Sequence, residues 1–117
     1  MELKHKVTKL ESGLRVVSVP MPVESVTVIA MVGVGSRHED KGVGGVSHFI
    51  EHFMSNGTKK YKNKKDIWRA TEEVGGVRNA YTSKDVTAYW SKVAKEHIEL
   101  ATDICGELVC RPMFPEK

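Results

Sequence analysis

The first third of the chain alternates apolar segments with turns, and this pattern predicts β-structure. Residues 5–22 divide into two short segments around Ser12-Gly13, which is typical of two strands joined by a turn. Residues 25–35 (SVTVIAMVGVG) are apolar at both odd and even positions. A strand of this composition is usually buried on both faces, and we therefore expect it in the centre of a sheet.

Three later segments have the apolar spacing of amphipathic helices. In residues 46–56 apolar side chains recur on one helical face, which predicts that this face packs into the core. The members of this apolar stripe are Val46, Phe49, Ile50, Phe53 and Met54. A second helix is predicted within residues 63–76, with Asn63 as its cap and two glycines at its end. A third is predicted over about residues 95–110.

Residues 77–94 are rich in Tyr, Thr, Val and Trp and are interrupted near residues 83–85, which predicts two further strands. The predicted order is strand, strand, strand, helix, helix, strand, strand, helix. This order favours an α+β fold with helices packed on one face of a mostly antiparallel sheet. With 117 residues, the chain has the length of one domain.

Composition narrows the class of partner. Hydrophobic residues make up 40% and charged residues 28%, which is ordinary for a folded protein, and a net charge of +3 does not indicate nucleic-acid binding. The lysine-rich run 59–65 is expected to be a solvated turn. No apolar segment approaches the roughly 20 residues of a membrane span. Cys105 and Cys110 form no C-x-x-C motif and no secretory signal is recognisable, so we expect a cytoplasmic protein.

The segment HFIEH, residues 48–52, carries the candidate chemistry. At about 100° per residue, His48 and His52 lie roughly 40° apart around the helix, and Glu51 lies about 60° to the other side of His48. Two imidazoles one turn apart can bind a single Zn²⁺ at about 2.0–2.1 Å, and Glu51 is placed to act as a general base. The alternative is the ordinary polar face of a surface helix, and the spacing alone leaves both interpretations open.

The same segment has the H-x-x-E-H form of the inverzincin peptidases. Around it, the sequence resembles the pitrilysin family, which includes insulin-degrading enzyme and mitochondrial processing peptidase. The matching segments follow the order of the family and cover almost the whole chain. They are LESGLRVV (10–17), GVGSRHED (33–40), GVSHFIEHFMSNGTKKY (45–61), EEVGGVRNAYTSKDVTAYW (72–90) and RPMF (111–114).

The resemblance implies a zinc-dependent endopeptidase with His48 and His52 as zinc ligands and Glu51 as the catalytic base. It also implies that an edge strand holds extended peptide substrates through its backbone; the residues concerned are Asn79, Ala80, Tyr81 and Thr82. The alternative for these four residues is an ordinary strand of the sheet. By the same resemblance, residues 1–117 form the N-terminal portion of a peptidase half-domain, truncated at its C-terminal side. A third zinc ligand, a Glu beyond residue 117, and a homologous second half or subunit are then expected.

Two classes of function follow. In the first, the chain derives from a zinc endopeptidase, and residues 1–117 by themselves have negligible activity and tend to self-associate. In the second, it is a non-catalytic subunit that binds peptides or a partner through an exposed sheet edge. Retention of all three motif residues favours the first class. No other residue is expected to complete the metal site; those considered are Glu72, Glu73, His5, His38 and His97.

Overall fold

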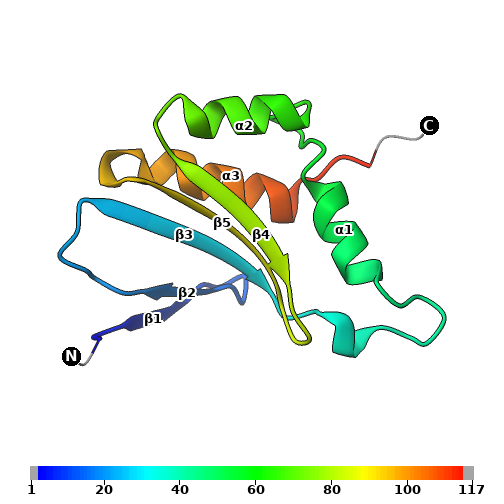
Figure 1. Cartoon of the computed structure of the whole chain (residues 1–117). Helices are drawn as coiled ribbons and strands as arrows, with labels where there is room; N and C mark the ends of the chain where they lie inside the picture. Colours follow the sequence, from blue (N-terminus) through cyan, green and yellow to red (C-terminus); the bar gives the residue numbers. More distant parts are fainter. Residues whose placement is uncertain (1–2, 115–117) are drawn as a thin grey trace.

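A three-stranded antiparallel sheet in the order β3-β5-β4 organises the computed structural model, which describes residues 3–114 (Figure 1). Strand β5 (Thr87–Ala94) lies in the middle and pairs with both β3 (Ser25–Val32) and β4 (Val77–Thr82). The predicted α+β class with an antiparallel sheet is therefore confirmed.

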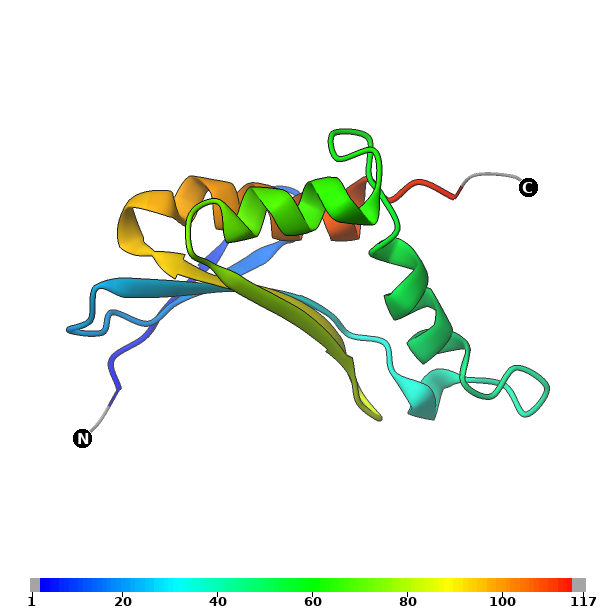
Figure 2. The same cartoon turned by 45° about the horizontal axis from the view of Figure 1, so that its top comes forward.

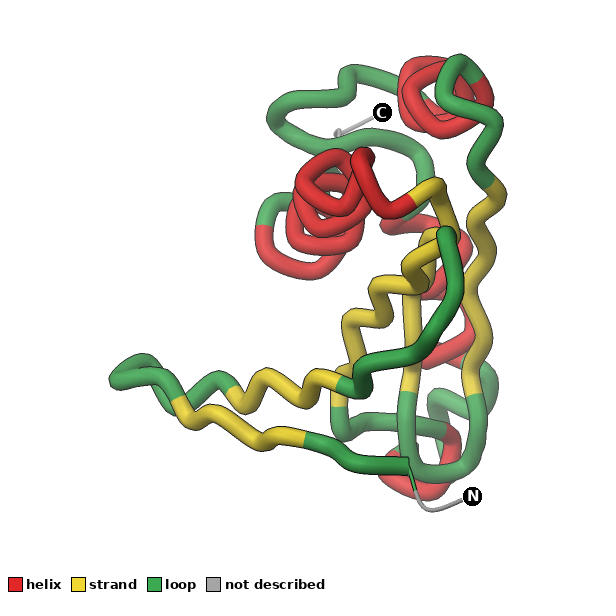
Figure 3. The backbone as a smooth tube through the Cα atoms, turned by 90° about the vertical axis from the view of Figure 1, so that its left-hand side faces the viewer, coloured by secondary structure: helices red, strands yellow, loops and turns green. Residues whose placement is uncertain are grey.

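A separate hairpin precedes the sheet and extends away from it (Figure 3). It consists of β1 (Lys6–Lys9) and β2 (Arg15–Ser18), and every residue of both strands is exposed. The turn predicted at Ser12-Gly13 is confirmed, since Gly13 has a φ of +88° and its N–H donates to the carbonyl of Leu10. A left-handed φ of this kind favours glycine over residues with a side chain.

Two helices cover one face of the sheet (Figures 1 and 2). They are α2 (Lys64–Glu72) and α3 (Ile98–Cys110), the latter preceded by a 3₁₀ turn at Lys95–His97. Asn63 caps α2 as predicted, because its Oδ1 accepts the N–H of Asp66 at 3.0 Å. None of the helices within residues 3–114 has the length and apolar character needed to cross a bilayer.

The core lies between these helices and the sheet. Its fully buried centre combines Ile67 of α2, Tyr89 of β5, and Ile104 and Leu108 of α3. Residues of α2, β5 and α3 thus share one apolar layer, which ties the sheet to both helices.

The prediction that residues 25–35 form a central strand is wrong. Strand β3 is an edge strand within residues 3–114, and Ile29 and Met31 on its second face are exposed. The central position belongs to β5. An apolar strand indicates that burial on both faces would be favourable, but in the described residues helices cover one face of the sheet only.

Helix α1 (Val46–Met54) stands beside the β4 edge of the sheet rather than over its face (Figures 1 and 2). Its buried residues are Ser47 and Glu51, whereas Phe49 is 65% exposed and Ile50 is also exposed. The predicted packing of the apolar stripe into the core is therefore wrong for Phe49 and Ile50, whereas Met54 packs against the core cluster as predicted. The buried side is rotated from the centre of that stripe by roughly a third of a turn. Phe53 stacks on Phe114 instead, at a centroid distance of 5.3 Å.

A buried carboxylate anchors the segment that follows α1. Glu107 of α3 accepts hydrogen bonds from the Thr58 hydroxyl (2.8 Å), the Lys60 N–H (3.0 Å) and the Arg111 guanidinium (3.1 Å). A buried carboxylate is tolerated when several donors compensate its lost hydration. The C-terminal side of α1 is thereby tied to the core helix α3.

The core assignment predicts a specific loss of stability. Ile104 is 1% exposed, whereas Ile98 on the same helix is 47% exposed. Ile104→Ala should lower the free energy of unfolding by about 2–5 kcal/mol, because it removes buried methyl groups and leaves a cavity. Ile98→Ala should cost less than about 1 kcal/mol. Urea denaturation of both variants measures the difference, and equal losses would contradict the proposed core.

Candidate active site

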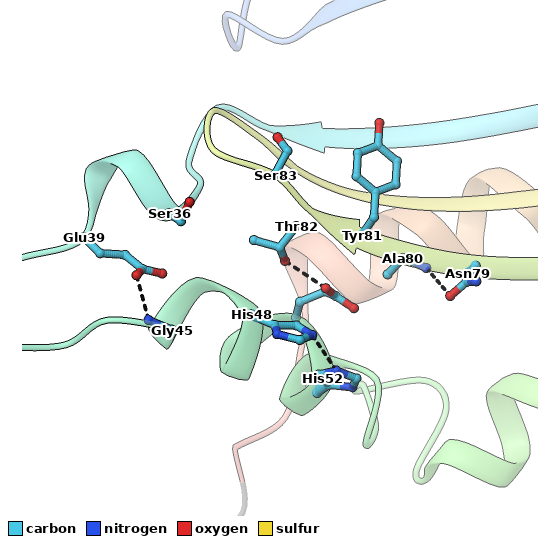
Figure 4. Close-up of a pocket in the computed structure, with 11 residues that line it drawn as sticks. Ser36, Glu39, Gly45, His48, His52, Asn79, Ala80, Tyr81, Thr82 and Ser83 are labelled. Atoms are coloured by element: carbon cyan, nitrogen blue, oxygen red, sulfur yellow. Dashed lines mark hydrogen bonds between the residues drawn. The ribbon is translucent and has the colours of Figure 1, made fainter.

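Helix α1, the loop directly before it and the distant strand β4 line one pocket (Figure 4). Helix α1 contributes His48, Glu51 and His52, and strand β4 contributes residues 79–82. The loop before α1 contributes Ser36, Glu39 and Gly45. The structure therefore brings all seven residues predicted from the sequence to the border of a single pocket.

The two histidines converge. Their Nε2 atoms are 2.9 Å apart, their ring centroids are 4.6 Å apart, and both side chains are exposed (Figure 4). Two nitrogens bound to one tetrahedral zinc at about 2.0–2.1 Å are separated by about 3.3 Å. The observed separation differs from this by a few tenths of an ångström, which small side-chain rotations can supply. His48 and His52 therefore fit a shared zinc ion.

Glu51 lies on the buried side of α1, against β4. Its Oε2 accepts a hydrogen bond from the hydroxyl of Thr82 at 2.8 Å, across 31 residues of sequence. The charge of Glu51 also acts on the core residue Tyr89, whose pKa is raised to about 12, mainly by burial and additionally by this charge. The carboxylate thus lies between the core and the histidine pair.

The N-terminus of α1 is held by Glu39, which the sequence analysis did not identify. The two oxygens of its carboxylate accept the N–H groups of Gly45 (2.7 Å) and Ser47 (2.9 Å). These backbone hydrogen bonds, that of Gly45 first, lower the pKa of Glu39. A carboxylate at this position satisfies free N–H groups and complements the helix dipole. The available signal was an acidic residue just before the glycine-rich segment that leads into the helix.

A short 3₁₀ helix at Ser36–His38 connects this loop to the sheet. The N–H of Ser36 donates to the Ser83 carbonyl (3.0 Å) and that of Arg37 to the Lys84 carbonyl (2.9 Å). Gly35 is required at this approach, because a Cβ there would lie 2.3 Å from the Ser83 oxygen. His38 accepts the N–H of Gly35 through Nδ1 at 3.1 Å, so it stabilises the loop.

Strand β4 is an edge strand within residues 3–114, as the peptide-binding prediction requires. The N–H of Ala80 donates to Oδ1 of Asn79 at 2.9 Å. Side chains alternate along the strand, so Tyr81 points away from α1 whereas Thr82 points toward it (Figure 4). Peptide binding by residues 79–82 stays a prediction, while the side chain of Thr82 has a contact that the sequence did not indicate.

The described residues supply two candidate metal ligands rather than three. No group of three His, Cys, Asp or Glu side chains that could hold a metal ion occurs within residues 3–114. Glu72 and Glu73 are exposed at the end of α2, outside the pocket, and His5 and His97 also lie outside it. The third ligand expected beyond residue 117 lies outside the described residues.

The family model for insulinase, peptidase family M16, matches residues 15–117. The chain belongs to the insulinase family. Among its relatives is a Bacillus subtilis protein named as an uncharacterized zinc protease, YmxG, which is 37% identical over 91% of this chain. The beta subunit of the human mitochondrial-processing peptidase is 36% identical over 89% of this chain. The resemblance to this peptidase family is therefore confirmed.

A solved structure supports the same fold. The crystal structure of a protease from Helicobacter pylori superposes with a TM-score of 0.92 at 32% identity and covers 98% of this chain. This M16 segment nevertheless spans only 28% of that protein and 26% of the Bacillus relative. It corresponds to about a quarter of the length of these proteins.

The convergence of the histidines predicts weak zinc binding by the 117-residue chain. Two imidazoles leave the remaining coordination positions to solvent, so the affinity should be below that of a three-ligand site. Isothermal calorimetry should detect zinc binding that His48→Ala and His52→Ala abolish. His5→Ala, an exposed histidine outside the pocket, should bind zinc normally. Equal zinc uptake by the unmodified chain and His48→Ala would contradict the site.

Proposed function

We propose that this M16 chain supplies the metal-binding and proton-transfer residues of a zinc-dependent endopeptidase. The observation that carries the proposal is the convergence of His48 and His52 beside the Glu51 carboxylate, next to an edge strand. This arrangement combines a pair of metal ligands, a base and a place for a peptide in one pocket.

Each residue has a distinct role in this proposal. His48 and His52 would hold zinc, which when bound polarises a peptide carbonyl and lowers the pKa of water. Glu51 accepts a proton from the attacking water and delivers it to the leaving amine. The buried position of Glu51 restricts the carboxylate to the space between β4 and the histidines, which favours this transfer.

The substrate in this proposal is an extended peptide that pairs with the β4 edge. Backbone pairing at residues 79–82 would hold peptides of varied sequence, because it uses N–H and C=O groups that every residue has. We further propose that a third protein ligand and a homologous second half or subunit come from the family length outside this chain. The name of the human relative, a peptidase subunit, supports the expectation of a homologous partner.

A non-catalytic binding role is the second candidate, and the exposed side of α1 favours it. Phe49 is largely exposed, and its ring lies 5.9 Å from that of Phe53, which in turn stacks on Phe114 at 5.3 Å. Exposed apolar side chains grouped in this way are typical of contact surfaces. A subunit that only binds peptides or partners would use this surface and the sheet edge without needing Glu51.

Replacement of Glu51 separates the two candidates. In the complete polypeptide that contains this sequence, Glu51→Gln should retain zinc, because Glu51 is not a proposed ligand. It should lower peptide hydrolysis by about 10²–10⁴-fold, since an amide cannot accept the proton. A quenched fluorescent peptide assay and zinc analysis measure the two effects. Glu73→Gln, an exposed position outside the pocket, is the control, and near-normal turnover by Glu51→Gln would exclude it as the base.

The exposed side of α1 predicts self-association of the 117-residue chain. Phe49→Ser should increase the monomer fraction, because it removes the most exposed phenylalanine of α1 from the contact surface. Light scattering over a concentration series measures this change. Val23→Ser, an exposed apolar position before β3, is the matched control. Identical association of the two variants would show that α1 is not the contact surface.

A further inference from the structure

The side chain of Thr82 is the one hydrogen-bond donor to Glu51 among residues 3–114. Its Oγ1 lies 2.8 Å from Oε2 of the carboxylate, at a partly buried position between β4 and α1. Figure 4 shows this hydrogen bond between Thr82 and α1 as a dashed line. The other oxygen, Oε1, accepts no hydrogen bond from the described residues.

Glu51 needs such a partner for two reasons. A glutamate has several rotatable bonds, so its carboxylate occupies a range of positions unless a contact restricts it. Burial also removes water from the carboxylate, and a protein donor compensates for part of the lost hydration. One hydroxyl meets both needs, because it binds one oxygen and leaves the other without a donor from the described residues.

Thr82 is a rigid donor. It is β-branched, which restricts its first side-chain torsion, and it sits at the end of β4 opposite Thr87 of β5. The turn that follows is fixed by hydrogen bonds from Ser36 and Arg37 to the carbonyls of Ser83 and Lys84. The hydroxyl is therefore presented from an immobilised strand end rather than from a loop.

We propose that Thr82 is a positioning residue for the general base. Its hydroxyl holds Oε2 of Glu51, so that Oε1 is the oxygen that accepts the proton beside His48 and His52. This inference rests on the proposed peptidase function. It assigns to the Thr82 side chain a role different from backbone pairing with a peptide, which any residue at this position could perform.

Three variants of the complete polypeptide test the proposal. Thr82→Val preserves the shape of the side chain and removes the hydroxyl, whereas Thr82→Ser keeps the hydroxyl. Thr87→Val is the matched control. Thr87 lies on the neighbouring strand β5, and its hydroxyl donates to the Val34 carbonyl at 2.8 Å rather than to Glu51. Each variant is measured for kcat, KM, zinc affinity and melting temperature. The carboxyl ¹³C resonance of Glu51 is followed by NMR in the zinc-free protein.

Thr82→Val should lower kcat by about 10–100-fold, the usual effect of losing a residue that orients a group of a metal site. Its KM and zinc affinity should change less than about twofold, because neither peptide backbone pairing nor the histidines are altered. The Glu51 resonance should shift. Thr82→Ser should keep both kcat and the Glu51 resonance close to those of the unmodified protein. Thr87→Val should lower the melting temperature without lowering kcat.

A normal kcat and an unshifted Glu51 resonance in Thr82→Val would overturn the proposal. An equal loss of kcat in Thr87→Val would also overturn it, because the effect would then be one of strand stability. Glu51→Gln, measured in parallel, separates this failure from that of the peptidase proposal. If Glu51→Gln is inactive and Thr82→Val is normal, the role of Thr82 alone is wrong. If Glu51→Gln is active, both proposals are wrong.

Discussion

The burial of the Glu51 carboxylate against β4 determines which side of α1 faces the sheet and which side is exposed. A carboxylate removed from water requires a donor, and Thr82 supplies one from a different element. Once Glu51 faces β4, helical geometry places His48 about 60° and His52 about 100° from Glu51 around the helix axis, at the exposed border of the pocket. The same rotation directs Phe49 outward. One polar contact thus accounts for both the histidine pair and the exposed apolar side of the helix.

Both ends of α1 are held by carboxylates that accept backbone N–H groups. Glu39 binds the first turn of the helix, and Glu107 of α3 binds the segment after its last turn. The loop that carries Glu39 is in turn fixed to the β4–β5 turn. The helix is therefore supported from both the sheet and the core, which is the rigidity that a metal-and-base constellation requires. This support does not depend on packing of Phe49 or Ile50, which are exposed.

Local patterns in the sequence were sufficient for the elements and for the motif. Apolar spacing predicted the helices, Asn63 was recognisable as a cap, and H-x-x-E-H identified the three central residues. The orientation of α1 and the edge position of β3 were not predictable in this way, because each depends on which elements meet in three dimensions. Glu39 was missed, and Thr82 was predicted only for its backbone, without the contact between its side chain and Glu51. The Thr82–Glu51 contact spans 31 residues, and nothing in a local window indicates it, whereas Glu39 is only 6 residues from Gly45 and had a local signal that was not used.

The two candidate functions share one helix surface. Around α1, His52 lies between His48 and Phe49, about 60° from the latter, so the proposed metal ligands adjoin the exposed apolar side chains. A polypeptide segment that covers Phe49 therefore comes within reach of the histidine pair as well. In the proposed zinc site two imidazoles leave the coordination incomplete, and the exposed phenylalanines are apolar side chains that the described residues leave uncovered. The open coordination positions and the uncovered phenylalanines lie on the same side of α1, so a single packing partner can fill both. Metal binding and partner binding are therefore expected to be thermodynamically coupled.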